Sequence, residues 1–172
     1  MKLDGTIPIH ASAQAVWDVV VDPIRLASCM PGVQDIRQID ERTFEGTILA
    51  SVGPIDGSFA FRSILTTARF PDDIVIAVTG ADSVTKSRVE MDVQASVIER
   101  DSTQAELAYH ADVRVKGRLA ILGEMVLRAT AGLMIGEITQ CLRSQVETVS
   151  RGSRAAGSGD GVEIDAVEPG IE

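Results

Sequence analysis

The sequence predicts an α+β domain in which helices cover one side of a curved antiparallel sheet. Segments with strand-like alternation of apolar and polar residues fill most of the chain up to Lys116. Two short helical segments interrupt the strands near the start of the chain. One long proline-free segment, from about Arg118 to Ser150, predicts a final helix, and such a helix needs a sheet to pack on.

The composition is that of one globular domain. The 172 residues include 45% hydrophobic and 24% charged residues, so we expect one domain over residues 1–150. The formal net charge of −9 disfavours nucleic acid as a partner, because phosphates repel an acidic chain. No apolar run has the length of a signal peptide or a membrane span, which predicts a cytoplasmic protein.

The first thirty residues predict a strand and two short helices. Residues 2–9 alternate apolar and polar side chains, which is the period of a strand. Ser12 is a suitable N-cap for the helix that follows. Asp22-Pro23 ends this helix and starts the next, which ends at Pro31-Gly32.

Six further strands are predicted, with a loop expected over residues 80–83. The last two alternate most clearly, with apolar residues on one face and polar residues on the other. This pattern predicts an antiparallel sheet that is covered on one face only. The predicted strands span residues 33–39, 43–52, 55–69, 74–79, 89–97 and 105–115.

The long helix has an apolar stripe with an unusually small centre. Small residues from Ala129 to Gly136 either let the helix approach the sheet closely or leave space for a ligand. We expect this centre to face a cavity. The predicted stripe consists of Leu119, Leu122, Val126, Ala129, Leu133 and Leu142, with Met125, Ile138 and Val146 beside it.

Residues 151–172 predict a flexible acidic tail. The segment is rich in glycine and serine and then in carboxylates, a composition typical of disorder. Its scattered apolar residues leave a docking motif as the alternative.

Nucleophile, base and metal-ligand patterns are weak in this sequence. His10 and His110 share no metal-ligand spacing and no carboxylate cluster, so we predict neither a catalytic nor a metal site. Cys29 and Cys141 are far apart, and free buried thiols are favoured over a disulfide between them.

Three separated segments carry motifs that together resemble one family. The first contains Val16-Trp17, Asp22-Pro23 and Cys29-Met30-Pro31-Gly32, and the second contains Val52-Gly53-Pro54-Ile55-Asp56-Gly57. The third runs from Tyr109 through Ala111-Asp112-Val113, Val115, Gly117 and Leu119-Ala120 to Leu122-Gly123. Over about residues 1–147 the pattern resembles the CoxG family of carbon monoxide dehydrogenase subunits, which belongs to the SRPBCC/START-like superfamily.

This resemblance implies a helix-grip fold, as in birch-pollen-allergen-like and START-type domains. Such a fold has a seven-stranded curved antiparallel sheet, two short helices and a long C-terminal helix over a cavity. It also implies a non-catalytic accessory protein with a molybdenum hydroxylase of the carbon monoxide dehydrogenase type as its partner. The cavity would hold a hydrophobic small molecule, such as a quinone or lipid, and no intrinsic cofactor. The protein would link the enzyme to the membrane or quinone pool, as a peripheral protein at the inner face. Many members carry an apolar anchor that this sequence lacks, so we expect at most transient membrane contact.

The candidate cavity residues come from the strands and the long helix. Plain core packing is the alternative for each strand residue, and the Tyr109 hydroxyl could meet a quinone oxygen or a water. Two other functions stay open, a polyketide cyclase or aromatase-like enzyme and an assembly factor acting only by protein contacts. The candidates are Phe59, Phe61, Met91, Tyr109, Met125, Ala129, Gly132, Leu133 and Met134.

Overall fold

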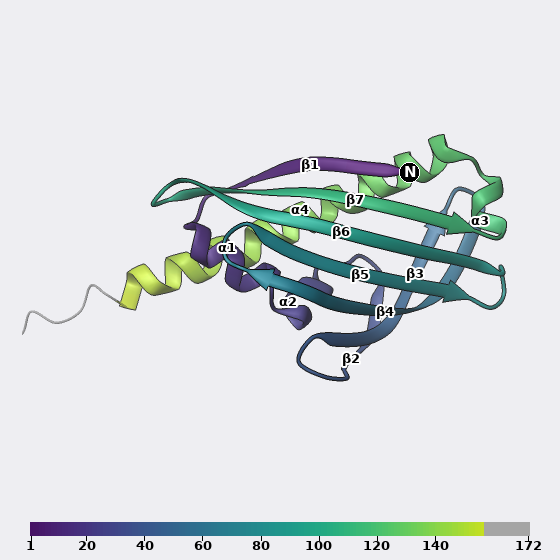
Figure 1. The fold of residues 1–172 in the computed structure, drawn as a ribbon, viewed down its shortest axis with the longest axis horizontal. Helices are drawn as coiled ribbons and strands as arrows, with labels where there is room; N and C mark the ends of the chain where they lie inside the picture. Colours follow the sequence, from purple (N-terminus) through teal and green to yellow (C-terminus); the bar gives the residue numbers. More distant parts are fainter. Residues whose placement is uncertain (157–172) are drawn as a thin grey trace, which may run out of the picture.

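The computed structural model describes the backbone of residues 1–156 and the side chains of residues 1–149, 151 and 152. These residues form one seven-stranded antiparallel sheet with helices packed against its inner face, which confirms the predicted class (Figure 1). The elements in chain order are β1 (Lys2–Ile9), α1 (Ala13–Val20), α2 (Pro23–Ser28), β2 (Val33–Gln38), β3 (Thr43–Val52), β4 (Ile55–Arg69), β5 (Asp73–Asp82), β6 (Ser87–Asp101), β7 (Gln104–Lys116), α3 (Arg118–Ile121) and α4 (Glu124–Ala156).

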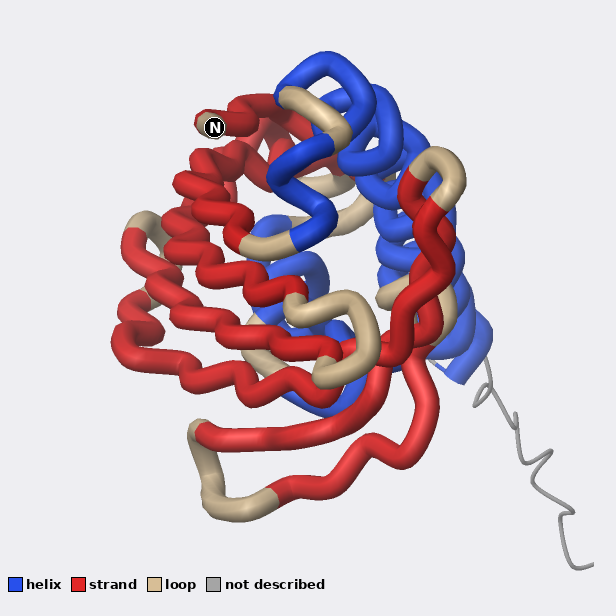
Figure 2. The backbone as a smooth tube through the Cα atoms, turned by 90° about the vertical axis from the view of Figure 1, so that its right-hand side faces the viewer, coloured by secondary structure: helices blue, strands red, loops and turns tan. Residues whose placement is uncertain are grey.

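The first and last strands lie side by side in the sheet. The strand order is β1-β7-β6-β5-β4-β3-β2, so every other neighbour in the sheet is also a neighbour in sequence. β1 pairs with β7, for example Ile7 with Leu107, and both side chains are buried on the inner face. Viewed from the end, the sheet curves around the helices (Figure 2). This curvature leaves an interior that α4 must cover.

Both short helices begin where the sequence predicts, α1 after its predicted N-cap Ser12 and α2 at the predicted Asp22-Pro23 boundary. The Ser12 side chain accepts a hydrogen bond from the Ala15 N–H at 3.3 Å. The Asp22 carboxylate accepts from the Ile24 and Arg25 N–H groups at 3.0 and 3.1 Å. These bonds satisfy N–H groups that have no partner within the helix, so the local sequence positions α1 and α2.

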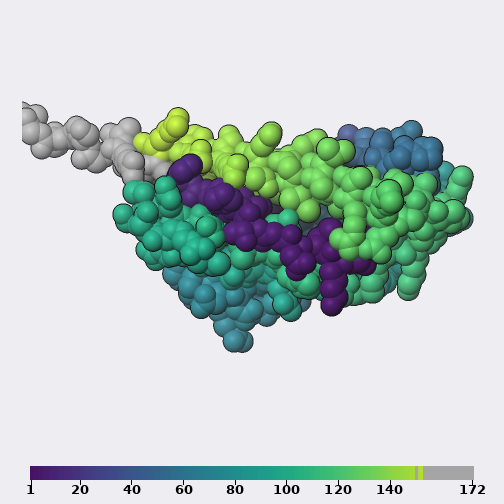
Figure 3. All heavy atoms as spheres, turned by 90° about the horizontal axis from the view of Figure 1, so that it is seen from above, coloured from purple at the N-terminus to yellow at the C-terminus, as the bar shows by residue number. Residues whose placement is uncertain are grey.

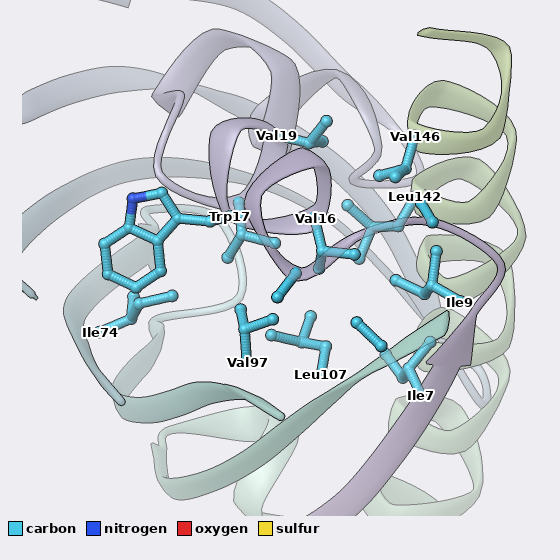
Figure 4. Packing of buried hydrophobic residues seen from close by; sticks show 14 of the residues in the cluster. Ile7, Ile9, Val16, Trp17, Val19, Ile74, Val97, Leu107, Leu142 and Val146 are labelled. Atoms are coloured by element: carbon cyan, nitrogen blue, oxygen red, sulfur yellow. The ribbon is translucent and has the colours of Figure 1, made fainter. Parts of the chain in front are cut away.

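The largest buried cluster lies where α1, the C-terminal half of α4 and strands β1, β6 and β7 meet (Figure 4). Val16 of α1 and Val146 of α4 are fully buried there, and Leu142 is 2% exposed. Each such side chain contributes about 1.5–3 kcal/mol when it is fully buried. This cluster therefore anchors α4 to the rest of the domain.

Two arginines also hold α4 against the edge of the sheet, where it lies alongside β1 (Figure 3). Arg128 donates to the Lys2 carbonyl and Arg143 to the Pro8 carbonyl, both at 2.9 Å. Because β1 is an edge strand, these bonds occupy carbonyls that have no neighbouring strand.

The predicted single helix from Arg118 is interrupted, and the predicted stripe is wrong at Met125, Ala129 and Leu133, whereas Val126 and Leu142 lie inward as predicted. α3 ends at Ile121, and Gly123 has a positive φ of +82° before α4 begins. This break changes the rotation of α4 relative to α3, so a stripe counted continuously through it points partly the wrong way. Met125 is 85% exposed and Leu133 is 73% exposed.

Two predicted boundaries also differ. β5 continues to Asp82, because Gly80 and Ala81 pair with Val89 and Arg88 of β6, so the loop predicted over residues 80–83 is wrong. α4 continues past Ser150 to Ala156. The rest of the predicted acidic tail, residues 157–172, lies outside the described residues.

The prediction of two free thiols is wrong. Cys29 and Cys141 form a disulfide with a Cα–Cα distance of 5.4 Å across 112 residues of sequence. The fold brings them together because α4 passes over the end of α2, a proximity that the sequence spacing does not contain. A disulfide that closes a long loop typically stabilises by about 2–4 kcal/mol.

Leu142→Ala should lower the free energy of unfolding by about 2–5 kcal/mol, because it leaves a cavity in the cluster that anchors α4. Leu133→Ala makes the same chemical change on the exposed face of the same helix and should change it by less than about 0.5 kcal/mol. Urea denaturation of both variants measures the difference. Equal losses would contradict the assigned orientation of α4.

Candidate functional site

The centre of the inner face carries apolar side chains that the domain does not bury. Val78 of β5 and Met91 and Val93 of β6 are half-buried and belong to none of the three buried clusters. Register pairs Val78 with Met91, and strand alternation places all three on the face that carries Phe59 and Phe61.

α4 contributes half-buried side chains from the opposite side. Counting back from the buried Leu142 in steps of three and four residues identifies one face of the helix. Its members upstream of Leu142 are Leu127, Ala131, Met134, Ile135 and Ile138, and all are half-buried. We call these side chains, together with Val78, Met91 and Val93, the inner apolar region.

The three buried clusters surround the inner apolar region. The largest, with Leu142, lies at one end, and a second joins Val52, Phe59 and Leu119 at the other. The third joins Ala27, Phe44 and Phe61 beside α2. α4 is thus packed at both ends, while its centre passes over apolar strand residues without burying them. Apolar surface that the protein itself leaves uncovered favours an apolar ligand.

Of the four strand residues predicted to line a cavity, two are packed in buried clusters and two are half-buried on the inner face. Phe59 and Phe61 are buried in clusters, and Phe61 makes an edge-to-face contact with Phe44 at 6.1 Å. Met91 and Tyr109 are half-buried on the inner face. Sequence reasoning missed Val78, because residues 74–78 are all apolar and carry no alternation that marks the inner face.

The predicted helix residues are mostly on the wrong face. Met134 lies on the inner face, whereas Met125, Ala129, Gly132 and Leu133 are exposed. A Cβ built on Gly132 would meet no atom within 4 Å, so the small centre of α4 is open surface on this side. The sequence analysis placed Ile138 beside the apolar stripe but named neither it nor Ala131 as a cavity candidate, although the spacing from Leu142 identifies both. That the inward-facing candidates contact a ligand stays a prediction.

Tyr109 provides a hydroxyl at the edge of the inner apolar region. Its ring covers Gly5, where an added Cβ would clash with the ring and its hydroxyl oxygen. Burial raises the pKa of Tyr109 above its usual value of 10.0, and the nearby Asp4 carboxylate raises it further. The hydroxyl therefore stays protonated at neutral pH and can donate a hydrogen bond to a ligand oxygen.

A separate hollow of about 440 Å³ lies on the outer face of the sheet. Arg37 and Arg62 approach the Glu45 carboxylate at 3.6 and 2.5 Å, and Arg88 approaches Glu90 at 3.4 Å. These arginines and carboxylates give the hollow a mixed lining of charged and small side chains, so it suits a lipid-like ligand less well than the inner apolar region does. It is lined by Asp35, Arg37, Glu45, Gly46, Thr47, Ala60, Phe61, Arg62, Thr79, Gly80, Ala81 and Arg88.

A model of one protein family, the CoxG subunit of carbon monoxide dehydrogenase, matches residues 5–147. The chain belongs to the CoxG family. The match begins in β1 and ends within α4, so it includes the sheet, the short helices and the inner apolar region. Among curated proteins, none matches the CoxG chain.

Solved structures with the START-like fold resemble this CoxG-family chain. A conserved protein from Geobacillus kaustophilus aligns with a TM-score of 0.79 and 18% identity over 86% of this chain and 96% of its own. The Zhui aromatase/cyclase from Streptomyces sp. R1128 aligns at 0.64 and 18%, over 91% and 98%. A START superfamily protein from Mycobacterium smegmatis aligns at 0.61 and 15%, over 86% and 98%. At these identities the likeness shows the fold alone.

The two histidines of this CoxG-family chain lie away from the inner apolar region. His10 follows β1 and is exposed, and His110 points to the outer face, where its Nδ1 contacts the Asp4 carboxylate. Among the described residues, no three histidine, cysteine, aspartate or glutamate side chains form a group that could hold a metal ion. In the same part of the chain, no helix has the length and apolarity needed to cross a membrane.

Because Tyr109 is the only tyrosine, its titration can be followed by tyrosinate absorbance. We expect a midpoint above 10.0 in the folded protein and near that value in denaturant. The raised pKa favours the protonated form in the folded state, so its contribution to stability is present below about pH 10 and is lost as the pH rises through the folded pKa. The Tyr109→Phe variant, which has no tyrosine, gives the background absorbance. A midpoint in the folded protein at or below the midpoint in denaturant would contradict the burial of this hydroxyl.

Proposed function

We propose that this protein is a non-catalytic accessory protein that holds a hydrophobic small molecule in the inner apolar region. The observation that supports this most directly is the half-buried apolar surface between three buried clusters. Its walls come from β5, β6 and α4, and Tyr109 supplies a hydrogen-bond donor at its edge. A mostly apolar wall with few polar groups suits a ligand with a hydrophobic body and a small polar head.

The energetics support a ligand of moderate affinity. Full burial of one large apolar side chain contributes about 1.5–3 kcal/mol, so covering the part that is still exposed contributes roughly a third of that or less for each. Several such side chains line the region. The summed free energy of covering them must exceed the free-energy cost of immobilising the ligand. A ligand that covers only one or two of them would bind weakly.

The family supports the choice of partner and ligand class. CoxG members bear the name of a carbon monoxide dehydrogenase subunit. We therefore propose a molybdenum hydroxylase of the carbon monoxide dehydrogenase type as the partner and a quinone or lipid as the ligand. The protein would connect the enzyme to the membrane or quinone pool by transient contact at the inner, cytoplasmic face of the membrane.

An enzymatic alternative has less support from the inner apolar region. A cyclase or aromatase would need several polar groups that converge on its substrate. Besides Tyr109 of β7, the candidate polar group is Thr130 of α4, whose hydroxyl already donates to the Val126 carbonyl at 3.1 Å. Both histidines lie away from the inner apolar region. We therefore favour binding over catalysis.

Calorimetric titration with decylubiquinone tests the ligand, and copurification with a molybdenum hydroxylase tests the partner. Saturable binding without conversion of the quinone is the expected result. Copurification without quinone binding would instead favour an assembly factor that acts by protein contacts alone. Chemical conversion of a bound polyketide-like substrate would favour the enzyme.

Ala131→Phe should weaken decylubiquinone binding about tenfold or more, because the added ring fills the inner apolar region. Ala129→Phe makes the same change two residues earlier, on the exposed face of α4, and should leave the affinity unchanged. Calorimetry of the two variants provides the measurement, and near-ultraviolet circular dichroism shows that both remain folded. If Ala129→Phe weakened binding as much as Ala131→Phe, the ligand would not lie under α4.

A further inference from the structure

The Cys29–Cys141 disulfide lies at the border of the inner apolar region. Cys29 caps the C-terminal end of α2, and Cys141 lies on α4 three residues after Ile138 and seven after Met134. These spacings place Cys141 on the same side of α4 as the two inner side chains. The bond therefore closes the side of the region that lies between α2 and α4.

Few other contacts join α2 to α4. α2 packs through Ala27 onto Phe44 and Phe61, whereas α4 packs through Leu142 and Val146 onto α1. Leu26 and the capping Cys29 of α2 also reach the cluster of Leu142 and Val146, so the two helices meet at the C-terminal end of α2. The disulfide is the covalent link between the two helices at this point.

Gln145 forms the polar link at the same place. Its Nε2 donates to the Ser28 hydroxyl at 2.9 Å and the Arg25 carbonyl at 3.3 Å, and it lies 3.3 and 3.7 Å from the sulfurs of Cys29 and Cys141. An amide nitrogen has only two hydrogens to share among these four acceptors. Without the disulfide, the hydrogen bonds of Gln145 and the packing of Leu26 would hold α2 to α4, while Leu142 and Val146 would keep α4 on α1.

We propose that the Cys29–Cys141 disulfide is a redox-operated latch that controls exchange of the ligand in the inner apolar region. The proposal rests on the proposed function, and it assigns a regulatory step to the same site. When the disulfide is present, α2 and α4 stay together and exchange is slow. When it is reduced, the two helices separate at this side and exchange is fast. A cytoplasmic disulfide is commonly transient and redox-sensing, which suits this role.

A dithiol reductant supplies the two electrons. Its thiolate attacks the half-buried Cys141 sulfur, the bond between Cys29 and Cys141 breaks, and Cys29 leaves as a thiolate that can accept a hydrogen bond from Gln145. The second thiol of the reductant then displaces Cys141. The reductant becomes a disulfide, and its two protons pass to the two protein thiols.

The test measures how fast the uncharged apolar fluorophore N-phenyl-1-naphthylamine leaves the protein after dilution into excess cyclodextrin. Dithiothreitol should accelerate dissociation from the wild-type protein about tenfold, and near-ultraviolet circular dichroism should show that the reduced protein stays folded. Alkylation followed by mass spectrometry counts the thiols released. The double variant Cys29→Ser/Cys141→Ser should release the fluorophore at the fast rate with or without dithiothreitol.

Each result distinguishes the latch from the function on which it rests. Binding with the same dissociation rate in the oxidised and reduced wild-type protein would overturn the latch and leave the ligand-binding function standing. A disulfide that resists dithiothreitol in the folded protein would overturn the latch as well. Failure of the fluorophore to bind in either state would count against the proposed function itself.

Gln145→Leu tests the chemical step separately. Loss of the amide donor should slow reduction by dithiothreitol severalfold, because Cys29 leaves without a hydrogen-bond donor. The dissociation rate of the fluorophore from the oxidised variant should stay at the wild-type value. An unchanged reduction rate would exclude Gln145 from the step.

Discussion

The rest of the structure depends on how α4 attaches to the curved sheet. Its C-terminal half is held by Leu142 and Val146 against α1, and its first turns lie beside the cluster of Val52, Phe59 and Leu119. Along the same stretch, α4 follows the edge strand β1 through hydrogen bonds from Arg128 and Arg143 to backbone carbonyls. A helix held at both ends over a concave sheet leaves apolar side chains beneath its centre only partly covered.

This arrangement explains why most of the small residues at the centre of α4 do not line the inner apolar region, although the sequence predicted that they face a cavity. Gly123 ends the continuity between α3 and α4, and its positive φ sets the rotation with which α4 begins. Ala129, Gly132 and Leu133 then face solvent, while Ala131 and Met134 face the sheet. The inner apolar region therefore depends on larger strand residues and on the curvature of the sheet, rather than on gaps in the helix.

The disulfide belongs to the same arrangement. It connects α4 to α2, and α2 in turn packs on β3 and β4 through Ala27. Ligand exchange and redox state are coupled in this protein if separation of these two helices is the route into the interior.

The hollow on the outer face of the sheet differs from the inner apolar region, because its arginines are paired with Glu45 and Glu90 and its floor consists of small residues.

The sequence by itself determined the fold class, the strand periods and the helix caps, because these depend on residues close together in the chain. Ser12, Asp22 and the alternation through β6 and β7 each act over a few residues, and the family motifs lie in the same segments. Only the tertiary structure decided which face of α4 points inward and that Cys29 meets Cys141. Both depend on the path of the chain through the break at Gly123 and over the sheet, and a rotation or a contact across 112 residues leaves no local pattern in the sequence.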